Sequence, residues 1–312
     1  MAEEQPTLRE TRVLEPGTLW TRITQQTAHA LQCGALQSIP TESEFVEQDG
    51  ISFLVRILSN LIRKDKAKKK QEKKATNSGK EFNPFLPYEE DLFVADISDT
   101  HLCLLNKFNV VDYHLLIVTR KFEEQETWLT VQDFEAMWRC LAEFEGLAFY
   151  NGGKVAGASQ RHKHLQLVPL PLAANGLKIP IEPAIASARF QGSIGTIPSF
   201  PFVHALASLE PCWAKSPWEA AEAISQCYHN LLRVVGLQGD DRTSGNRQSG
   251  AYNLLATQQW MLIVPRSQEE FESISVNSLG FAGALLVRNE QQMELLKKCG
   301  PMNILKSVAQ SQ

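Results

Sequence analysis

Gly157-Ala-Ser-Gln-Arg-His-Lys-His-Leu-Gln-Leu-Val-Pro169 is a stretch in which a turn of small residues leads into a strand. Side chains alternate between the two faces of a strand, so His162, His164 and Gln166 share one face, with about 7 Å between successive members. The side chains between them face the other way. We therefore predict a strand over 162–169 that is buried on one face and presents two imidazoles and an amide on the other.

Further strands are predicted where apolar runs of strand length are bounded by turns. These runs lie at 53–58, 92–97, 101–106, 114–119, 251–256 and 260–264. Helices are predicted at 8–37, 130–147, 217–236 and 289–298. Thr130, with Asp133 three residues later, is the N-terminal capping pattern of the second helix. Because short turns join neighbouring strands, we expect an α+β fold with antiparallel strands rather than repeating βαβ units.

The second part of the chain repeats the element order of the first in coarse form: helix, loop, strand, strand. We therefore predict two related halves that form an internal pseudo-dimer. Residues 1–170 are the expected catalytic half, and the proline- and glycine-rich residues 171–199 are expected to cross the surface. Residues 200–312 are expected to form a second, non-catalytic half that completes the site.

The chain has 312 residues, a hydrophobic content of 43% and a formal net charge of −4. This balance gives no sign of a nucleic-acid binder, so local positive groups must hold any anionic ligand. The six cysteines include no Cys-x-x-Cys pair, which favours buried, reduced thiols. Neither a signal peptide nor a run of about 18 apolar residues is evident, so we expect a cytoplasmic enzyme without a membrane span.

A basic run at 63–74 leads into a polar, turn-rich stretch at 75–80. The combination predicts a surface loop. Two interpretations stay open: the run is a solvated tether, or it is a flap that attracts polyphosphate.

The face shared by His162, His164 and Gln166 allows three interpretations. The first is the solvent face of a half-exposed strand. The second is a metal site, since two histidines at i and i+2 can chelate zinc, but the segment holds no third ligand and glutamine is a poor one. The third is nucleophilic catalysis by one imidazole that its neighbours orient.

The flanking residues favour the third interpretation. Three glycines precede the strand: Gly152, Gly153 and Gly157. Glycine lets backbone N–H groups approach phosphate oxygens closely, and Ser159 and Gln160 add hydrogen-bonding side chains. The neutral form of imidazole is abundant near pH 7 and can attack phosphorus. These features indicate a nucleotidyltransferase in which one of the two imidazoles is the nucleophile.

Several segments carry a resemblance to a known family. They are Phe149–Gly153, Gly157–Gln166, Leu105–Phe108, His114–Thr119 and Asn277–Gly283. Over most of its length the chain resembles the ATP adenylyltransferases, also called diadenosine tetraphosphate phosphorylases. These enzymes belong to the histidine-triad superfamily, in the branch that holds galactose-1-phosphate uridylyltransferase. In that branch glutamine replaces the third histidine of the triad, as Gln166 does here.

The resemblance implies a histidine-triad-like antiparallel sheet with flanking helices, and a reversible ping-pong reaction. Diadenosine tetraphosphate and phosphate would give ATP and ADP through an adenylylated histidine. His164 would be the nucleophile, and Gln166 would hydrogen-bond the transferred phosphoryl group. His162 would orient His164 through its backbone carbonyl or a ring contact.

The same resemblance implies a set of nucleotide-binding positions. Asn151, Gly157, Ala158, Ser159 and Gln160 would line the nucleotide site, with Asp99 and Thr100 near the ribose or base. Lys64 would meet the polyphosphate, and Asn277, Ser278 and Leu279, with Arg288 behind them, would add a second wall. A divalent cation, magnesium, would accompany the nucleotide through the substrate phosphates rather than through a protein metal site.

Two alternatives stay open: a uridylyl or other nucleotidyl-sugar transferase, and a non-catalytic nucleotide-binding protein. Lys163 stands where the uridylyltransferases have proline, and the cysteines do not supply their metal ligands, which weighs against a sugar phosphate. The intact His164 and Gln166 argue against a non-catalytic role. The expected partners are small nucleotides, with no nucleic acid and no membrane, and the molecule is expected to be a monomer or a homodimer. Of the other histidines, His29, His204 and His229 are expected to be structural, and His101 and His114 to lie at the edge of the core.

Overall fold

The computed structural model describes residues 14–58, 83–174, 176–209, 216–237 and 246–312. Its strands are β1 (Thr41–Gln48), β2 (Ile51–Leu58), β3 (Phe93–Asp96), β4 (His101–Leu105), β5 (Leu115–Thr119), β6 (Gly146–Gly152), β7 (His164–Pro169), β8 (Arg189–Gln191), β9 (Ile194–Thr196), β10 (Ala205–Ser208), β11 (Tyr252–Ala256), β12 (Trp260–Pro265), β13 (Glu270–Phe271), β14 (Ile274–Ser275) and β15 (Ala284–Val287). Its helices are α1 (Leu19–Cys33), α3 (Val131–Leu141), α4 (Glu182–Ala186), α5 (Pro217–Val234), α6 (Ser278–Phe281), α7 (Glu290–Cys299) and α8 (Pro301–Val308), with the 3-10 turns η1 (Glu90–Leu92) and η2 (Lys154–Ala156).

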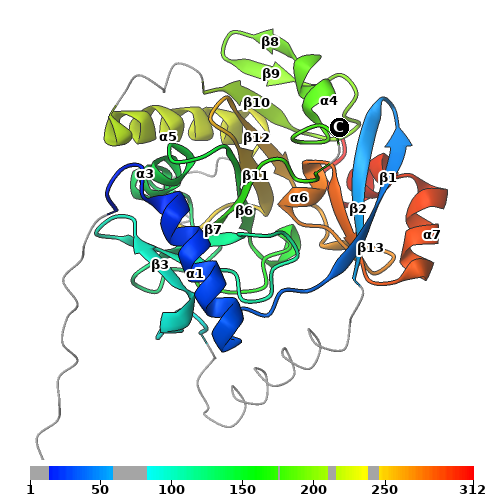
Figure 1. The fold of residues 1–312 in the computed structure, drawn as a ribbon. Coiled ribbons are helices and arrows are strands. Elements are labelled where there is room, and N and C mark those ends of the chain that lie inside the picture. The colour runs from blue at the N-terminus through cyan, green and yellow to red at the C-terminus, as the bar shows by residue number, and fades with distance from the viewer. Residues whose placement is uncertain (1–13, 59–82, 175, 210–215, 238–245) are drawn as a thin grey trace, which may run out of the picture.

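A ten-stranded antiparallel sheet runs through the molecule in the order β3-β4-β5-β7-β6-β11-β12-β10-β9-β8 (Figure 1). Its first five strands are a three-stranded meander, then α3, then a hairpin whose second strand inserts beside the meander. The other five repeat this plan with β8 to β10, α5 and the β11–β12 hairpin. The prediction of an α+β fold built from two related halves is confirmed.

The halves meet in the middle of the sheet, where β6 pairs with β11. The register sets Asn151 opposite Asn253 and Tyr150 opposite Leu254. A second connection is the small sheet β1-β2-β15, in which β2 of the first half pairs in parallel with β15 of the second. Both pairings bring the second half against the strands that carry the candidate site.

Each face of the large sheet has its own hydrophobic core. Helices α1, α3 and α5 cover one face, and Leu165 and Leu167 of β7 point into that core. The small sheet and α6 to α8 cover part of the other face, where Val168 of β7 packs. Figure 1 shows α1, α3 and α5 on one side of the molecule and β1, β2 and α7 on the other. The alternation predicted for 162–169 is therefore present: the leucines face the helices, and the even-numbered side chains face away.

Helix α3 begins as predicted and ends earlier than predicted. The Thr130 hydroxyl accepts from the backbone of Asp133, and the Asp133 carboxylate accepts from the backbone of Thr130, so the capping box is complete. The helix stops at Leu141, and the predicted extension to residue 147 is wrong because 146–152 form β6. A Cβ at Gly146 would lie 2.8 Å from a methyl group of Leu167, so this glycine permits β6 and β7 to pack closely.

Residues 171–199, predicted to cross the surface, contain α4, β8 and β9. Ile179, Ile181 and Ile197 are buried in the core below the small sheet. Proline and glycine punctuation hid these elements, since strands of three residues have no readable periodicity. Strand β1 was not predicted either, because its sequence, Thr-Glu-Ser-Glu-Phe-Val-Glu-Gln, is that of a polar edge strand.

Candidate active site around His164

His164 opens β7, and its imidazole is only 4% exposed. Its Nδ1 lies 2.8 Å from the backbone carbonyl oxygen of His162. Because a carbonyl only accepts hydrogen bonds, Nδ1 carries the proton and the lone pair of the neutral ring is on Nε2. The predicted contact with the His162 carbonyl is thus present, and it leaves Nε2 as the ring nitrogen that can accept a proton or attack an electrophile.

Burial keeps His164 neutral. Desolvation is the largest effect and lowers the pKa of His164 to about 4; the bond to the His162 carbonyl opposes this, and the charge of His162 adds to it. An imidazole with this pKa is almost entirely unprotonated at pH 7. The ring is therefore ready to attack without first losing a proton.

The ring of His162 is held by contacts of its own. Its Nε2 lies 2.8 Å from the carbonyl oxygen of Thr119, and its Nδ1 lies 3.0 Å from the side-chain amide nitrogen of Asn83. Desolvation lowers the pKa of His162, and the backbone hydrogen bonds partly oppose the shift. Phe85 contacts both imidazoles edge-on, at 5.5 Å from His162 and 5.3 Å from His164 between ring centroids. His162 therefore supports the site through its carbonyl, while its ring is fully engaged elsewhere.

Gln166 belongs to a chain of polar side chains that the sequence did not predict. Its amide oxygen accepts from Nε2 of His114 at 2.9 Å, and Nδ1 of His114 lies 3.1 Å from the amide nitrogen of Asn106. With the oxygen so engaged, the NH₂ group of Gln166 is the part of its amide that can donate to an anion. His114, expected at the edge of the core, thus orients a site residue. Its position two strands away in the sequence gave no sign of this contact.

Gln125 holds the backbone of the nucleophile. Its amide oxygen accepts from the N–H of His164 at 2.9 Å, and its amide nitrogen donates to the carbonyls of Asn151 at 3.0 Å and His164 at 3.2 Å. The side chain is buried and replaces a ladder bond between β6 and β7 at the point where β7 begins. Nothing in the sequence marked this residue.

The second half fixes Asn151. Its amide oxygen accepts from the N–H of Ser278 at 2.9 Å, from the Ser278 hydroxyl at 2.7 Å and from the Asn253 amide at 3.0 Å. Arg266 donates to the Asn253 oxygen at 2.6 Å. Asn277 caps α6 by accepting from the N–H of Leu279 at 3.0 Å. Predicted residues of both halves thus meet in one buried network.

The glycine-rich turn lies against the same part of the second half. Gly153 and Gly157 have φ angles of +95° and +90°, which favour glycine. A Cβ at Gly157 would lie 3.0 Å from the carbonyl of Val276 and 3.0 Å from the Cβ of Asn277. The predicted positions 157–160 and 277–279 are therefore brought together, and Ser159 is exposed at the end of the turn.

Other predicted positions are not joined to this cluster. Thr100 lies next to Asp99 before β4, and its hydroxyl is 2.9 Å from Nδ1 of His101. Arg288 is exposed just after β15, and its backbone N–H donates to Gln292 at 2.8 Å. Among the residues that the structure describes, no hydrogen bond or ion pair ties Asp99, Thr100 or Arg288 to His164 or Gln166. Lys64 and the basic run 63–74 lie outside the described residues, so the roles of all four residues stay predictions.

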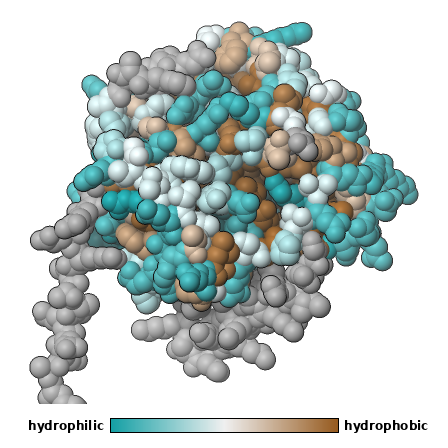
Figure 2. Space-filling model, in the orientation of Figure 1, coloured by the Kyte–Doolittle hydropathy of each residue, from teal (hydrophilic) through white to brown (hydrophobic). Residues whose placement is uncertain are grey.

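A cleft of about 710 Å³ lies at the far end of β7. Its lining comes from the α1–β1 connection, the β4–β5 connection and the chain after Pro169. A smaller adjoining pocket is lined by Asn277 and Leu279 and shares Arg56 with the cleft. Figure 2, drawn in the orientation of Figure 1, shows apolar residues in the middle of the face turned to the viewer, between α1 on one side and β1 and β2 on the other. Arg56 and Asp112 both line the cleft, and the Arg56 guanidinium donates to the carbonyl of Leu172 at 2.6 Å.

Ligand sets for a metal ion are sparse in the part of the chain that the structure describes. One group of three exists there, His29, Cys33 and Asp91, and all three are exposed. It lies on α1 and η1, and it includes neither His162 nor His164.

Two family models match the chain. Residues 9–187 match the model described as the Ap4A phosphorylase N-terminal domain. Residues 198–311 match the model described as the ATP adenylyltransferase C-terminal domain. The stretch between the two matches, residues 188–197, contains β8 and β9.

Curated relatives come from Saccharomyces cerevisiae. The chain is 28% identical to diadenosine 5′,5‴-P1,P4-tetraphosphate phosphorylase 2 over 273 residues, which is 80% of each chain. It is 26% identical to protein APA1 over 299 residues, which is 88% of each chain. Both alignments span most of this chain and most of the relative.

Solved structures share the fold. The crystal structure of yeast Ap4A phosphorylase Apa2 superposes with a TM-score of 0.77 at 22% identity, covering 96% of this chain and 99% of that one. The structure of the same enzyme in complex with Ap4A gives a TM-score of 0.76 at 21% identity over the same shares. This agreement supports the α+β fold described above.

Proposed function

The chain belongs to the Ap4A phosphorylase family, and we propose that it is an ATP adenylyltransferase. It catalyses the reversible phosphorolysis of diadenosine tetraphosphate to ATP and ADP. The observation that carries this proposal is the state of His164: a buried, neutral imidazole with its proton held on Nδ1 by the His162 carbonyl.

The first step is attack by Nε2 of His164 on the phosphorus that bears one adenosine. A P–N bond forms, the P–O bond to the next phosphate breaks, and ATP leaves. The imidazole then carries a positive charge, and the Nδ1–H bond to the His162 carbonyl becomes charge-assisted and stronger. This contact therefore stabilises the transition state more than the ground state.

The second step returns His164 to its starting state. An oxygen of inorganic phosphate attacks the adenylyl phosphorus, the P–N bond breaks, and ADP leaves. The NH₂ of Gln166 donates to the phosphoryl oxygens while its own oxygen accepts from His114. Backbone N–H groups of the 157–160 turn contribute further donors, since glycine permits close approach.

The cleft beside Arg56 is the proposed place for the nucleoside and the remaining phosphates. A divalent cation, magnesium, accompanies the polyphosphate. It would be held mainly through phosphate oxygens and water rather than by a protein metal site.

We further propose a cytoplasmic enzyme that acts as a monomer. Buried free thiols at Cys103 and Cys140 support a reducing compartment. No helix among the described residues is long and apolar enough to cross a membrane. The paired halves supply within one chain the ten-stranded sheet that a single-copy triad protein completes by dimerising.

Isotope-labelled phosphate tests the proposed reaction. Incubation with diadenosine tetraphosphate and ³²P-phosphate should place the label in the β-phosphate of ADP and leave ATP unlabelled. Without phosphate, net ATP formation should stop after at most one turnover per enzyme. Steady formation of ATP and AMP in water alone would instead identify a hydrolase. In a parallel reaction, transfer of the uridylyl group from UDP-glucose to a sugar phosphate would identify the uridylyltransferase alternative.

A further inference from the structure

Lys163 lies between the two histidines in the sequence and has no exposed surface. Its ammonium group is on the face of β7 opposite to the His164 ring. There it lies 2.7 Å from Oδ2 of Asp133, 2.9 Å from the carbonyl oxygen of Trp128 and 3.2 Å from the carboxylate of Glu123. Lysine is almost never fully buried, and this one directly precedes the strand that begins at His164.

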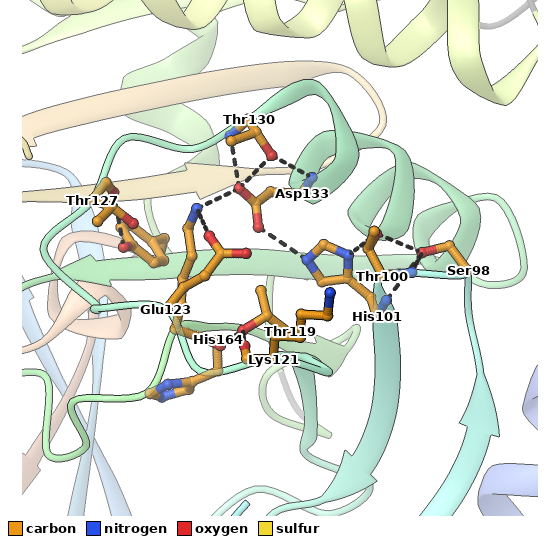
Figure 3. A network of polar contacts seen from close by, with 12 residues as sticks. Ser98, Thr100, His101, Thr119, Lys121, Glu123, Thr127, Thr130, Asp133 and His164 are labelled. Atoms are coloured by element: carbon orange, nitrogen blue, oxygen red, sulfur yellow. Dashed lines mark hydrogen bonds and ion pairs between the residues drawn. The ribbon is translucent and has the colours of Figure 1, made fainter. Parts of the chain in front are cut away.

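Asp133 is the centre of this cluster, and it is 1% exposed. One oxygen lies 2.9 Å from Nε2 of His101, and the other accepts from the N–H of Thr130 at 2.7 Å and from its hydroxyl at 2.9 Å. Figure 3 shows Asp133, Thr130 and His101 on one side of the strand and the His164 ring on the other. The carboxylate is therefore fixed to the first turn of α3 and holds Lys163 in place.

The backbone beside Lys163 connects the Lys163–Asp133 ion pair to the ring of His164. The N–H of Lys163 donates to the carbonyl of Glu123 at 2.8 Å. In a planar trans peptide the carbonyl of the preceding residue points the opposite way from this N–H. That carbonyl belongs to His162, and it accepts from Nδ1 of His164 at 2.8 Å. The peptide between 162 and 163 thus connects the buried ion pair to the imidazole.

An apolar side chain at position 163 would fill the same space without the free energy needed to desolvate an ion pair. Transfer of two ions from water costs several kcal/mol for each, and replacement of a buried ion pair by apolar residues is often neutral or stabilising. Methionine has nearly the length of the lysine stem and needs no partner. Packing alone therefore does not explain the charged side chains of Lys163 and Asp133. Positioning of the peptide between residues 162 and 163 does.

We propose that Lys163 and Asp133 are positioning residues for the nucleophile. Their ion pair fixes the peptide that joins residues 162 and 163, and this peptide fixes the orientation and the tautomer of the His164 ring. The kinetic part of this inference rests on the proposed adenylyl transfer, whereas the tautomer part does not.

Three variants and one control test the proposal. Lys163→Met and Asp133→Asn each remove one charge. The double variant Lys163→Met/Asp133→Asn removes both, and it leaves no buried ion without its partner if a single variant fails to fold. Lys178→Met is the control, because it removes an exposed lysine that pairs with Glu145 on the surface.

Nitrogen-15 NMR reads the tautomer directly. Long-range ¹H–¹⁵N correlations of the imidazole rings distinguish a protonated Nδ1 from a protonated Nε2, and the His164→Asn spectrum identifies the His164 signals among the seven histidines. The wild type and Lys178→Met should show a single His164 form with the proton on Nδ1. Lys163→Met and the double variant should show a mixture of the two tautomers. An unchanged Nδ1–H form in the double variant would overturn the proposal.

Single-turnover kinetics give the second readout. Lys163→Met should lower the rate of adenylyl transfer from diadenosine tetraphosphate roughly 100-fold, as small misplacements of a reacting group do. KM should change little, since the ion pair does not touch substrate. A double variant that folds stably and transfers at the wild-type rate would show that the pair only stabilises the fold. If the wild type itself transfers no adenylyl group, the proposed function fails, and the NMR result still decides the positioning role.

Discussion

At the scale of single residues, the position of His164 depends on side chains that never touch substrate. Gln125 is the clearest of these, since both backbone groups of His164 bond to its amide. Gln125→Met keeps most of the side-chain volume and removes these bonds. We expect a loss of about 2 to 4 kcal/mol in the free energy of unfolding, because buried backbone groups are left without partners. We also expect a fall in kcat that exceeds any rise in KM, and urea titration with steady-state kinetics measures both.

The control for this variant is Gln226→Met. Gln226 lies on α5, where its side chain is exposed and its amide nitrogen donates to the side-chain oxygen of Asn230 at 3.3 Å. Its loss should change the free energy of unfolding by less than about 0.5 kcal/mol. Equal kcat in Gln125→Met and Gln226→Met would contradict the role given to Gln125.

The low pKa of His164 predicts a specific dependence of stability on pH. The folded pKa is about 4 and the ordinary value is 6.5, so the unfolded chain binds the proton more readily. Stability from this group is complete above pH 6.5 and is lost as pH falls to 4, an effect of about 3 kcal/mol. Asp133, with a folded pKa of about 2, adds a further loss between pH 3.8 and pH 2.

Urea unfolding of the wild type and His164→Asn at pH 7, 5.5 and 4.5 measures the first loss. Asparagine does not titrate, so the difference in the free energy of unfolding between the two proteins should shrink by about 2.4 kcal/mol from pH 7 to pH 4.5. Parallel curves would mean that His164 is not buried in the neutral form.

Sequence reasoning reached part of this residue-scale picture. Strand alternation placed His162, His164 and Gln166 together, and the family resemblance implied that His162 orients His164 through its backbone carbonyl or a ring contact; the carbonyl contact is present. Gln125, His114 and Asn83 could not be found in the same way, because each comes from a distant segment and carries no periodic pattern. The partners of Gln125 and His114 are fixed only when β5, β6 and β7 pair.

At the scale of elements, the turn before β7 is shaped by close contact with the second half. Gly157→Ala puts a methyl group at a φ of +90° and 3.0 Å from the carbonyl of Val276. We expect the turn to move away from Asn277, and KM for diadenosine tetraphosphate to rise at least about tenfold because the phosphate donors are displaced. Steady-state kinetics at varied substrate measure the change.

Gly192→Ala separates strain from contact. Gly192 also has a positive φ, +62°, but no heavy atom lies within 4 Å of a Cβ built there. Gly192→Ala should lose free energy of unfolding through backbone strain, as Gly157→Ala does, but it should keep the wild-type KM. If Gly157→Ala and Gly192→Ala had the same KM, the turn at 157–160 would not be part of the binding site.

Elements with strong local patterns were predicted, and those that depend on packing were not. The capping box of α3 and the Ser216-Pro217 start of α5 each depend on residues within one helical turn of each other, and both are present. The strand at 146–152 was not separated from the helix before it. Its boundary is set by packing of Gly146 on β7, which no local pattern records.

At the scale of the whole molecule, the second half completes the site by fixing Asn151. Arg266 is buried and donates to Asn253, to the carbonyls of Val276 and Val308, and to two further carbonyls. Desolvation lowers the pKa of Arg266 to about 10, so it remains charged at pH 7. The guanidinium thus joins β12, β11 and the C-terminal helices.

Arg266→Met should therefore weaken both halves together. We expect a loss of at least about 3 kcal/mol in the free energy of unfolding, since several buried acceptors lose their donor. Peptides of β7 and β12 should lose protection at the same urea concentration, because β6 and β11 pair through the middle of the sheet. Hydrogen exchange with mass spectrometry measures both peptides, with the exposed Arg247→Met as control. Earlier opening of β12 alone would show that the halves are separate units.

The duplication itself was visible in the order of elements, but its geometry was not. No letter-by-letter repeat tells which strands of the two halves pair, and β8 and β9 lie in a stretch that was predicted to be a connection. The role of Asn253 and Arg266 follows from the β6–β11 pairing and has no local pattern in the sequence.

Trapping of the covalent intermediate tests the central claim most directly. The protein is incubated with adenine-labelled diadenosine tetraphosphate in the absence of phosphate, quenched in base, and digested for mass spectrometry. The adenylyl group should be found on His164, should be stable in base and lost in mild acid, and should leave as ADP when phosphate is added before the quench. An adduct that survives His164→Asn, or none in the base-quenched wild type, would contradict the account.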